Sequence, residues 1–427
     1  MALDGYGTNI KGYGIMDNYL RSVFLAVLNI ICFVISKICD YISIYWQGES
    51  VNDKIIDKER ILVVRLDEIG DMVLMSPLLR ELRRNKPQAE ITLVVKASVM
   101  SMFEFCPYID RVFGFDVQKG KFASLMGLFY ARQFCIKKLL SQSTYMCQYD
   151  LSIVPRWDRD YGYFAGYVAL FAMARRKIAY ASDVNSIKAR YDKSFDRFYT
   201  DLLHETTHVH EVERNLDILR YIGGVVVNKN LELWTSEKDE IFLKGLLPRK
   251  RAKGVMRIAL FLSSGAAKRE WPVDKYVEVM KLLQVDYQIE IILLGAGMHA
   301  ADLGKVFVSR CRETKNMINQ LTLRQTTALL RKCHVAFGGD TGPLHMAVAV
   351  GCPSLVLSCH PIGASITHVN APERFGPWQA KHAIVLRPYA RVGCEDGCCK
   401  GYAHCIKDIQ VEEVVYSMKK LFSVYSV

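Results

Sequence analysis

The segment Phe337-Gly-Gly-Asp-Thr-Gly-Pro-Leu-His345 places a glycine turn, an acid, a hydroxyl and a histidine between two apolar runs. Residues 335–337 end a predicted strand, and residues 344–350 are apolar and alanine-rich enough to form a buried helix. Gly342 then lies near the N-cap and Pro343 at the first helical position, where a missing amide hydrogen costs nothing. The amides and the positive dipole end of such a helix attract anions, so the segment predicts a phosphate site. The alternative is an ordinary capped turn without a ligand.

A second turn of this kind lies near residue 70. Ile61–Leu66 reads as a buried strand, residues 67–71 as a short loop and residues 72–84 as an amphipathic helix. Asp71 therefore stands at a helix entrance. It is either a capping carboxylate, which stabilises a helix by about 1 kcal/mol, or a general base at the carboxyl edge of a sheet.

These two segments and several others, in this order along the chain, resemble glycosyltransferase family 9, the heptosyltransferase family. The matching segments are Ile69-Gly-Asp71 with Leu74 and Pro77, Tyr149–Ile153, Ala174–Tyr180, Glu211–Leu216 before Ile222–Gly224, Lys268–Pro272 and Asp340–His345. The resemblance runs from about Ile61 to Val415. It implies a GT-B fold, in which two Rossmann-like domains with parallel sheets face a central cleft. It also implies metal-independent, inverting transfer of a sugar from a nucleotide diphosphate donor, with an ADP-linked sugar as co-substrate and no cofactor.

The chain length independently favours more than one domain, because 427 residues exceed what one hydrophobic core usually supports. A hydrophobic content of 51% argues against disorder. Strands alternating with helices predict parallel α/β sheets. The predicted parts are an apolar N-terminal extension at 1–54, an acceptor domain at 55–235, a linker at 236–254, a nucleotide-sugar domain at 255–408 and a helix at 409–427 that packs across the domains.

The periodicity of apolar residues predicts the individual elements. The predicted strands are Ile61–Leu66, Ile91–Val95 and Leu151–Val154 in the first domain and Arg257–Leu262, Ile289–Leu294 and Ser354–Leu357 in the second. Helices are predicted at Glu211–Tyr221 and Val411–Phe422.

The loop after the strand at 257–262 supplies a second part of a donor pocket. Ser263, Ser264 and Gly265 are small enough for backbone to approach phosphate closely, and Lys268 or Arg269 could neutralise the leaving diphosphate. The family places a lysine two residues before the tryptophan, whereas Arg269 stands at that position here. Both cations could instead form a solvated surface patch.

A further departure from the family follows Leu294-Gly-Ala-Gly297. The family commonly carries a glutamate there that holds the donor ribose, and the matching residue here is His299, with Asp302 the nearest acid. A neutral imidazole can also bond a hydroxyl. The alternative is a loop residue that binds no ligand.

These placements predict a mechanism. Asp71 would take the proton from an acceptor hydroxyl as that oxygen attacks the anomeric carbon from the face opposite the diphosphate. Asp340, Thr341 and Gly342, with Lys268 or Arg269, would hold the departing nucleotide diphosphate. The ring of His345 could reach the phosphate or pack beneath it. Cations and helix amides supply the positive field, so no metal site is expected.

The N-terminal extension contains an apolar segment, Val23–Ser36, bracketed by Arg21 and Lys37. It is shorter than the roughly twenty residues of a membrane-spanning helix, so it predicts a helix lying on the membrane surface. The aromatic residues of Ile42–Trp46 suit the same boundary. A marginal span or a helix packed on the protein itself are the alternatives. No small-residue cleavage site follows, which argues against a signal peptide.

The charge balance suits an anionic partner. The chain carries +12, and residues 1–50 contribute −1 of this total. Such an excess fits a phosphorylated acceptor or an anionic leaflet, whereas nucleic acid is disfavoured because no recognisable binding module is present. Arg156, Arg159 and Arg190 are the predicted acceptor contacts, with a solvated rim as the alternative.

Thirteen cysteines are present, and most lie among apolar neighbours, as reduced buried thiols do. This predicts a cytoplasmic enzyme, peripheral on the inner face of the cytoplasmic membrane. One group stands apart: Cys394, Cys398, Cys399 and Cys405, with His404 adjacent. It is a metal site, a reduced loop or a disulfide-clipped loop.

Two other functional classes remain open at this point. A nucleotide-dependent oxidoreductase would also use Rossmann-like halves, but no Gly-x-Gly-x-x-Gly turn follows a strand. A membrane-associated protein that binds a nucleotide sugar without catalysis is the other, because His299 departs from the family.

Overall fold

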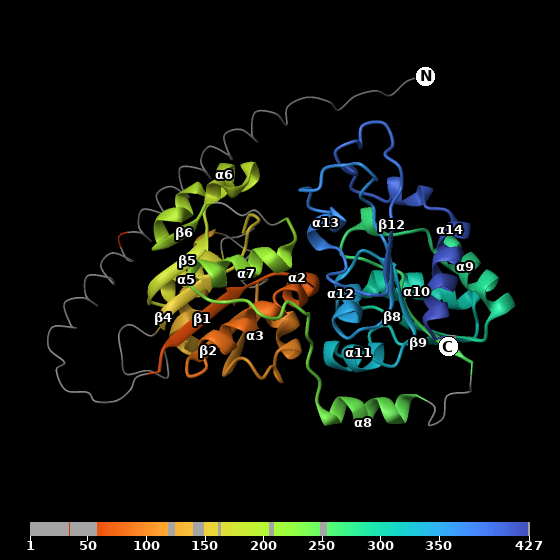
Figure 1. The fold of residues 1–427 in the computed structure, drawn as a ribbon, viewed down its shortest axis with the longest axis horizontal. Coiled ribbons are helices and arrows are strands. Elements are labelled where there is room, and N and C mark those ends of the chain that lie inside the picture. The colour runs from red at the N-terminus through yellow and green to blue at the C-terminus, as the bar shows by residue number, and fades with distance from the viewer. Residues whose placement is uncertain are drawn as a thin grey trace, which may run out of the picture. The chain divides into compact units, whose positions relative to one another are not determined.

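The computed structural model describes residues 58–117, 124–139, 149–160, 164–204, 209–247 and 254–425, together with Val34. Two six-stranded sheets, each with helices around it, organise this part of the chain (Figure 1).

The first sheet has the strand order β3-β2-β1-β4-β5-β6. Its strands are β1 (Arg60–Arg65), β2 (Glu90–Lys96), β3 (Arg111–Phe115), β4 (Tyr149–Val154), β5 (Ala174–Tyr180) and β6 (Asp201–Leu203). The pairs β1–β4, β4–β5 and β5–β6 are parallel, with Ile61 opposite Leu151. The chain therefore builds one side of β1 first and then crosses to β4 on the other side.

The second sheet repeats this pattern in the order β12-β11-β10-β7-β8-β9, and all of its pairs are parallel. Its strands are β7 (Met256–Phe261), β8 (Ile289–Leu294), β9 (Thr314–Asn316), β10 (Val335–Gly339), β11 (Ser354–Leu357) and β12 (Ala383–Leu386). Strands β7, β10 and β11 are buried along their whole length, as expected for a sheet covered on both faces.

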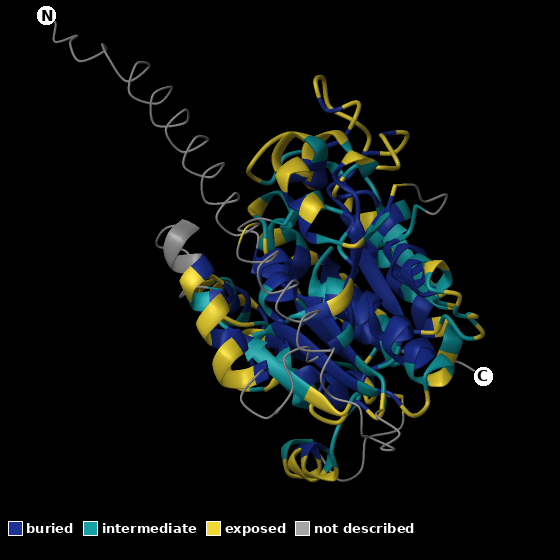
Figure 2. Ribbon diagram, turned by 90° about the vertical axis from the view of Figure 1, so that its left-hand side faces the viewer, coloured by how far each residue is buried: buried dark blue, intermediate teal, exposed yellow. Residues whose placement is uncertain are grey.

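The α-helices are α2 (Ile69–Leu74), α3 (Ser76–Asn85), α4 (Ser124–Phe134), α5 (Phe164–Phe171), α6 (Ser186–Asp192), α7 (Glu211–Tyr221), α8 (Glu237–Leu246), α9 (Val273–Asp286), α10 (Met298–Arg310), α11 (Leu323–Leu330), α12 (Gly342–Ala349), α13 (Pro372–Phe375) and α14 (Val411–Phe422). Buried residues are concentrated in the strands and in the helix faces that cover them (Figure 2).

By internal contacts the chain divides into two compact units. Unit 1 comprises residues 1–66, 88–94 and 115–205, and unit 2 comprises residues 67–87, 95–114 and 206–427. Helices α2, α3 and α7 therefore belong to unit 2, which also contains the second sheet. The predicted domain limits remain predictions.

The core of unit 2 is continuous from its sheet to the last helix. Val414, Met418 and Phe422 of α14 are fully or almost fully buried together with residues of β7, β10 and β11. The ring of Phe422 meets that of Tyr287, which follows α9, with centroids 5.0 Å apart. The helix predicted at Val411–Phe422 is confirmed, and its contacts described here are with α9 and the second sheet.

The helix predicted at residues 72–84 is wrong in its limits. It begins earlier, at Ile69, and it breaks at Met75, where α2 ends and α3 begins. Pro77 explains the break, because its ring would clash with the carbonyl of Val73 in a continuous helix and it has no amide hydrogen. The Ser76 hydroxyl donates to that carbonyl at 2.7 Å. Asp71 consequently lies within the first turn of α2 rather than before a helix.

Part of the segment predicted as a linker is a helix. Ser236 and Asp239 form a reciprocal capping box that begins α8, and the polar composition of this segment concealed the pattern. The sequence prediction also ended the second sheet at β11, whereas β12 extends it. Residues 248–253 lie outside the described part of the chain.

The predicted membrane-surface segments, Val23–Ser36 and Ile42–Trp46, lie outside the described residues apart from Val34. Within the described residues, no helix combines the length and apolarity that a membrane crossing needs.

Candidate functional site

The second sheet reverses its direction of growth between β7 and β10. The chain adds β8 and β9 on one side of β7 and then returns to add β10, β11 and β12 on the other side. Strands β7 and β10 pair directly, with Phe261 opposite Gly338. In open parallel sheets, ligands bind outside the carboxyl ends of strands at such a reversal. The segments that follow these strands are residues 263–270, called the candidate donor loop below, and residues 340–342.

Two glycines let these segments approach each other. A Cβ atom at Gly338 would lie 2.6 Å from the carbonyl oxygen of Phe261. At Gly339, a Cβ atom would collide with the backbone carbonyl oxygen of Arg269. The end of β10 therefore packs against the candidate donor loop through backbone alone, so larger side chains are excluded there.

Arg269, Asp340 and His345 are brought together at this end of the sheet. The Nε and Nη2 atoms of Arg269 donate to Asn370 Oδ1 at 3.1 and 2.8 Å, and its Nη1 lies 3.6 Å from Asp340 Oδ2. His345 Nε2 lies 3.8 Å from Asp340 Oδ1. Burial lowers the pKa of His345, so its imidazole is favoured in the neutral form and Arg269 supplies the positive charge.

Lys268 differs from its neighbour. It is half-buried, and among the described residues no ion pair or hydrogen bond engages its ammonium group. Of the two cations that the sequence left as alternatives, Arg269 is engaged with Asn370 and Asp340, whereas Lys268 is not engaged by any described residue.

Helix α12 begins one residue earlier than the sequence predicted. Thr341 is the N-cap, in extended conformation and without a side-chain capping bond, and Gly342 is the first helical residue. Pro343 has no amide hydrogen, and the amide of Leu344 donates to the carbonyl of Thr341 at 3.0 Å. The amide of Gly342 is therefore the first-turn donor that the helix offers to an anion.

Helix α2 packs directly on the start of α12, and both belong to unit 2. A Cβ atom at Gly70 would lie 2.9 Å from His345 Cδ2, and one at Gly342 would lie 2.7 Å from Ile69 Cβ. The two glycines thus allow two helix starts to touch. Asp71 is half-buried and follows Gly70 in the same turn of α2.

His299, at the start of α10, pairs with the carboxylate of Glu270, and the sequence analysis did not predict this pair. His299 Nε2 lies 2.8 Å from Glu270 Oε2, and Glu270 Oε1 accepts the amide of Ser264 at 3.0 Å. Glu270 is the last residue of the candidate donor loop, so an acid is present beside the place where the family carries one. Asp302 is instead exposed and paired with Lys305 at 2.8 Å.

The small residues of the candidate donor loop shape its backbone. The Ser264 hydroxyl donates to the carbonyl of Ala266 at 2.7 Å and accepts the amide of the same residue at 3.1 Å. Ser263 is half-buried and Gly265 is exposed. The Ser264 hydroxyl is therefore engaged by Ala266 of the same loop. Ser263 and Gly265 have small or no side chains, so a ligand could approach their backbone.

The segment Glu211–Leu216, one of the family-like motifs, anchors the wall of a pocket. Glu211 Oε1 accepts from Arg214 Nη1 and from Arg374 Nη2, each at 2.6 Å, and all three side chains are almost fully buried. His210 caps α7 through Nδ1, and its Nε2 lies 3.2 Å from the carbonyl oxygen of Gly376. Burial lowers the pKa of His210 to about 4.

That pocket opens beside Asp340 and His345. Its lining residues are Asp340, Leu344, His345, Val348, Val356, Ser358, Pro372, Phe375, Gly376, Pro377 and Val385. Asp340, His345 and Ser358 therefore line a largely apolar hollow, and a few polar groups in an apolar pocket are typical of small-molecule sites.

The carboxyl end of the first sheet has a different character. Of the three arginines predicted there, Arg159 lies over the ring of Tyr191 at 3.8 Å and Arg190 is exposed, 6.0 Å from the same ring. Arg156 is half-buried instead, with its Nε donating to the carbonyl of Arg159 at 2.8 Å. Arg159 and Arg190 thus lie near the ring of Tyr191, whereas the side chain of Arg156 belongs to a cluster of charged residues.

This cluster contains two further residues that the sequence analysis missed. Lys188 Nζ donates to the carbonyls of Tyr180 at 2.7 Å and Arg156 at 3.1 Å, and burial lowers its pKa to about 8. Burial raises the pKa of Asp192 to about 6. The pocket around them is lined by residues of both charges: Arg156, Asp158, Asp160, Lys188, Asp192 and Asp196 among others.

Comparison with known proteins identifies the family of the chain. The family model described as glycosyltransferase family 9 (heptosyltransferase) matches residues 170–397, more than half of the chain. The chain is 21% identical over 381 residues to lipopolysaccharide core heptosyltransferase OpsX of Haemophilus influenzae, covering 84% of this chain and 96% of that relative.

Solved structures show the same fold. A family 9 glycosyltransferase from Veillonella parvula has a TM-score of 0.64 at 18% identity and covers 86% of this chain and 98% of its own. The heptosyltransferase WaaC of E. coli with ADP has a TM-score of 0.62 at 15% identity, with 85% and 99% covered.

Proposed function

Because the chain belongs to glycosyltransferase family 9, the heptosyltransferase family, we propose that it transfers a heptose-like sugar from a nucleotide diphosphate to a hydroxyl of a cell-envelope glycolipid or polysaccharide. The chain is a glycosyltransferase, and the predicted GT-B fold class is confirmed by two Rossmann-like sheets and by the likeness to family structures. Membership of a transferase family argues against an oxidoreductase and against a binding protein without catalysis.

We propose the donor site at the carboxyl ends of β7, β8 and β10. Lys268 and the Gly342 amide would meet the diphosphate, with Arg269 as a second cation beside them. Glu270 and His299 would bond the ribose hydroxyls, because a carboxylate accepts and an imidazole can donate or accept. An adenosine diphosphate donor is supported by the E. coli WaaC structure, which contains ADP.

In this proposal Asp340 has a narrower role than the sequence suggested. A carboxylate repels a diphosphate, so it is not itself a phosphate ligand. Its 3.6 Å approach to Arg269 and 3.8 Å approach to His345 support a role in orienting those two groups. Thr341 would act through its backbone, as the N-cap of α12.

Asp71 is the proposed general base. The observation that carries this assignment is the contact of Gly70 with His345 and of Gly342 with Ile69, because it joins the helix of Asp71 to the proposed diphosphate-binding turn. Asp71 would accept the proton of the acceptor hydroxyl as its oxygen attacks the anomeric carbon. The diphosphate would leave from the opposite face, so the transfer would invert the configuration without a catalytic metal.

The acceptor and the location of the enzyme are also proposals. The name of the relative OpsX supports lipopolysaccharide core as the acceptor class. Arg159 and Arg190 are retained as proposed acceptor contacts, and Arg156 as a residue that supports them. We propose that the N-terminal extension holds the enzyme on the inner face of the cytoplasmic membrane.

The test of the proposed function is turnover of purified enzyme with an ADP-linked heptose. A thermal-shift series with ADP-, UDP-, GDP- and CDP-sugars identifies the nucleotide first, because a bound ligand raises the unfolding temperature in proportion to its saturation. Asp71→Asn is then expected to lower turnover by about a hundredfold or more while the dissociation constant of the donor changes little. Glu68→Gln is the matched control, since Glu68 is exposed, precedes the same helix and pairs with Lys96.

Equal turnover of the Asp71→Asn and Glu68→Gln variants would remove Asp71 from the mechanism. Absence of stabilisation by any nucleotide sugar, together with absence of transfer, would overturn the proposed function itself.

A further inference from the structure

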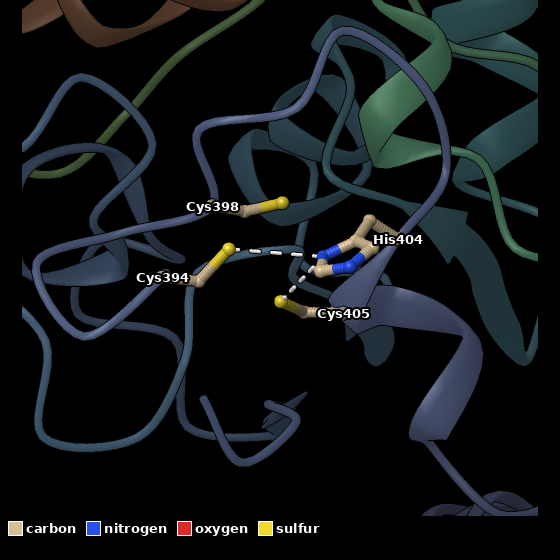
Figure 3. A group of neighbouring side chains, drawn as sticks. All are labelled: Cys394, Cys398, His404 and Cys405. Carbon is tan, nitrogen blue, oxygen red and sulfur yellow. Dashed lines mark hydrogen bonds between the residues drawn. The ribbon is translucent and has the colours of Figure 1, made fainter. Parts of the chain in front are cut away.

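The segment between β12 and α14, residues 387–410, contains a compact group of sulfur atoms. It has little regular structure apart from a 3-10 turn, η6, at Cys405–Asp408. Cys394, Cys398 and Cys405 are each no more than 1% exposed and form a small buried cluster of their own. With His404 they make the Cys/His cluster, whose side chains point toward one another in Figure 3.

The separations within the Cys/His cluster match those of a tetrahedral metal site. One ligand atom from each of the four residues lies within 4.8 Å of the other three. His404 Nδ1 lies 3.7 Å from Cys394 Sγ and 3.3 Å from Cys405 Sγ. Zinc bonds of about 2.3 Å to sulfur and about 2.0 Å to nitrogen give tetrahedral edges of roughly 3.5 to 3.8 Å. The two nitrogen–sulfur separations are close to the spacing that one ion imposes, and all the separations lie within 4.8 Å.

The backbone holds the first two cysteines on a tight turn. The amide of Cys394 donates to the carbonyl of Arg391 at 2.8 Å, and the amide of Gly397 donates to the carbonyl of Cys394 at 3.0 Å. Gly397 has φ of +137°, and a Cβ atom there would lie 2.8 Å from the ring of His368. A larger residue at 397 would strain the turn that positions Cys394 and Cys398.

No disulfide accounts for the arrangement among the described cysteines. All ten described cysteines are free, and Cys399 Sγ, 3.9 Å from Cys394 Sγ, is exposed. A long irregular segment needs a staple when it lacks its own apolar core, and thiolate–imidazole sets supply one by binding zinc.

We propose that Cys394, Cys398, His404 and Cys405 bind one Zn²⁺ ion, with His404 coordinating through Nδ1. Four protein ligands close the coordination sphere, so the ion is structural and offers no position to a substrate. Cys399 lies outside the ligand set, because its exposed sulfur is directed to the carbonyl of Gly393 at 3.5 Å. The proposal is independent of the donor and acceptor assigned above and leaves sugar transfer metal-independent.

Hydrogen bonds join the site to residues that follow the candidate donor loop. The turn η6 begins at Cys405, and its following residue, Ile409, accepts from Trp271 Nε1 at 3.3 Å. Lys275 Nζ donates to the carbonyls of Lys407 at 2.8 Å and Ile409 at 2.9 Å. Trp271 directly follows Glu270. The metal would therefore fix the segment on which the end of the candidate donor loop rests.

The test measures bound metal in full-length protein purified without chelator. Elemental analysis is expected to give about one zinc per chain in the wild type and less than roughly a tenth in Cys398→Ser and Cys405→Ser. The matched controls are Cys399→Ser, beside the site, and Cys352→Ser, a buried thiol elsewhere, which are both expected to keep the full amount. His404→Cys is expected to retain zinc, whereas His404→Ala is expected to lose it.

Two further measurements use the wild-type protein, so they do not depend on whether the variants fold. Cobalt exchanged into the wild-type protein is expected to give the visible absorption of a tetrahedral thiolate complex, and a chelator is expected to lower the unfolding temperature. Wild-type protein without bound metal, zinc retained in Cys405→Ser, iron in place of zinc, or a disulfide between these cysteines would each overturn the assignment.

Discussion

The two sheets share one strand order, but the charged side chains at their carboxyl ends differ in how far protein groups engage them. At the first sheet, Lys188 and Asp192 are buried in one cluster, and the Lys188 ammonium group donates to the carbonyl of Tyr180. At the second sheet, the glycines at the end of β10 allow the backbone of the candidate donor loop to approach closely. The ammonium group of Lys268 has no ion-pair or hydrogen-bond partner among the described residues. The Lys188 ammonium is already engaged by backbone carbonyls, whereas α12 offers a helix start that favours an anion. The topology is shared, and the difference in side chains is the reason for proposing the donor site at the second sheet.

The largest expected effect comes from filling the glycine gap at the second sheet. Gly339→Ala would place a methyl group against the backbone oxygen of Arg269, so either the strand or the candidate donor loop must move. We expect the free energy of unfolding to fall by about 3 kcal/mol, measured by urea denaturation. Gly265→Ala is the control, because a Cβ atom there meets open space. An unchanged urea midpoint for Gly339→Ala would contradict the role assigned to this close approach.

Removing the guanidinium group at the second sheet is expected to weaken donor binding. Arg269→Ala should raise the dissociation constant of ADP about 30-fold, as for a charged hydrogen-bonding group of about 2 kcal/mol. Isothermal titration calorimetry measures this. Arg190→Ala, an exposed arginine of the first unit, is the control and should bind ADP as the wild type does. Equal losses for both arginines would mean that the two sheet ends do not differ in nucleotide binding.

The charged cluster of the first sheet predicts a pH dependence of stability. Burial raises the pKa of Asp192 from 3.8 to about 6, so the folded protein keeps this proton at pH values where the unfolded chain has released it. The associated stability is present below about pH 4 and is lost as the pH rises to about 6. Asp192→Asn cannot ionise, so between pH 4 and 7 its free energy of unfolding should rise relative to the wild type by about 1 to 2 kcal/mol.

Urea denaturation at several pH values measures this difference. Parallel curves for the Asp192→Asn variant and the wild type would show that the carboxyl group titrates normally in the folded state.

The smallest expected effect concerns the arginines around Tyr191. Tyr191→Leu removes the ring beneath the Arg159 guanidinium, and the lost cation–π contact should cost about 0.5 to 1 kcal/mol of stability. Thermal unfolding measures it against Tyr389→Leu, whose ring is 80% exposed. A loss no greater than that of the control would indicate that Arg159 is held by other groups and is not tied to this ring.

The long buried elements that the sequence predicted were readable because apolar periodicity in such segments is a strong signal. The strands β8 and β11 and the helices α7 and α14 have the predicted limits. The short strand β12 was not predicted, although β11 has the same length. The helix α8 was missed because its charged residues resembled a linker, although its capping box was readable in the sequence.

The candidate site was predictable in its motifs and not in its contacts. Asp340–His345 was identified from a glycine turn before an apolar helix, and Asp71 from its place after a strand. The pairing of Glu270 with His299 was not foreseen, because it joins the ends of β7 and β8 across 29 positions of the chain. The same holds for Arg374, which reaches Glu211 from a distant segment.

The sequence by itself determined the family, the two parallel α/β sheets and the residues that supply acid, cation and helix start, because each depends on local order along the chain. Only the tertiary structure decided which charges neutralise one another and which are left for a ligand. It also decided that three cysteines and a histidine meet at the spacing of one ion. These outcomes depend on distances between segments that are far apart in sequence, and local patterns do not encode such distances.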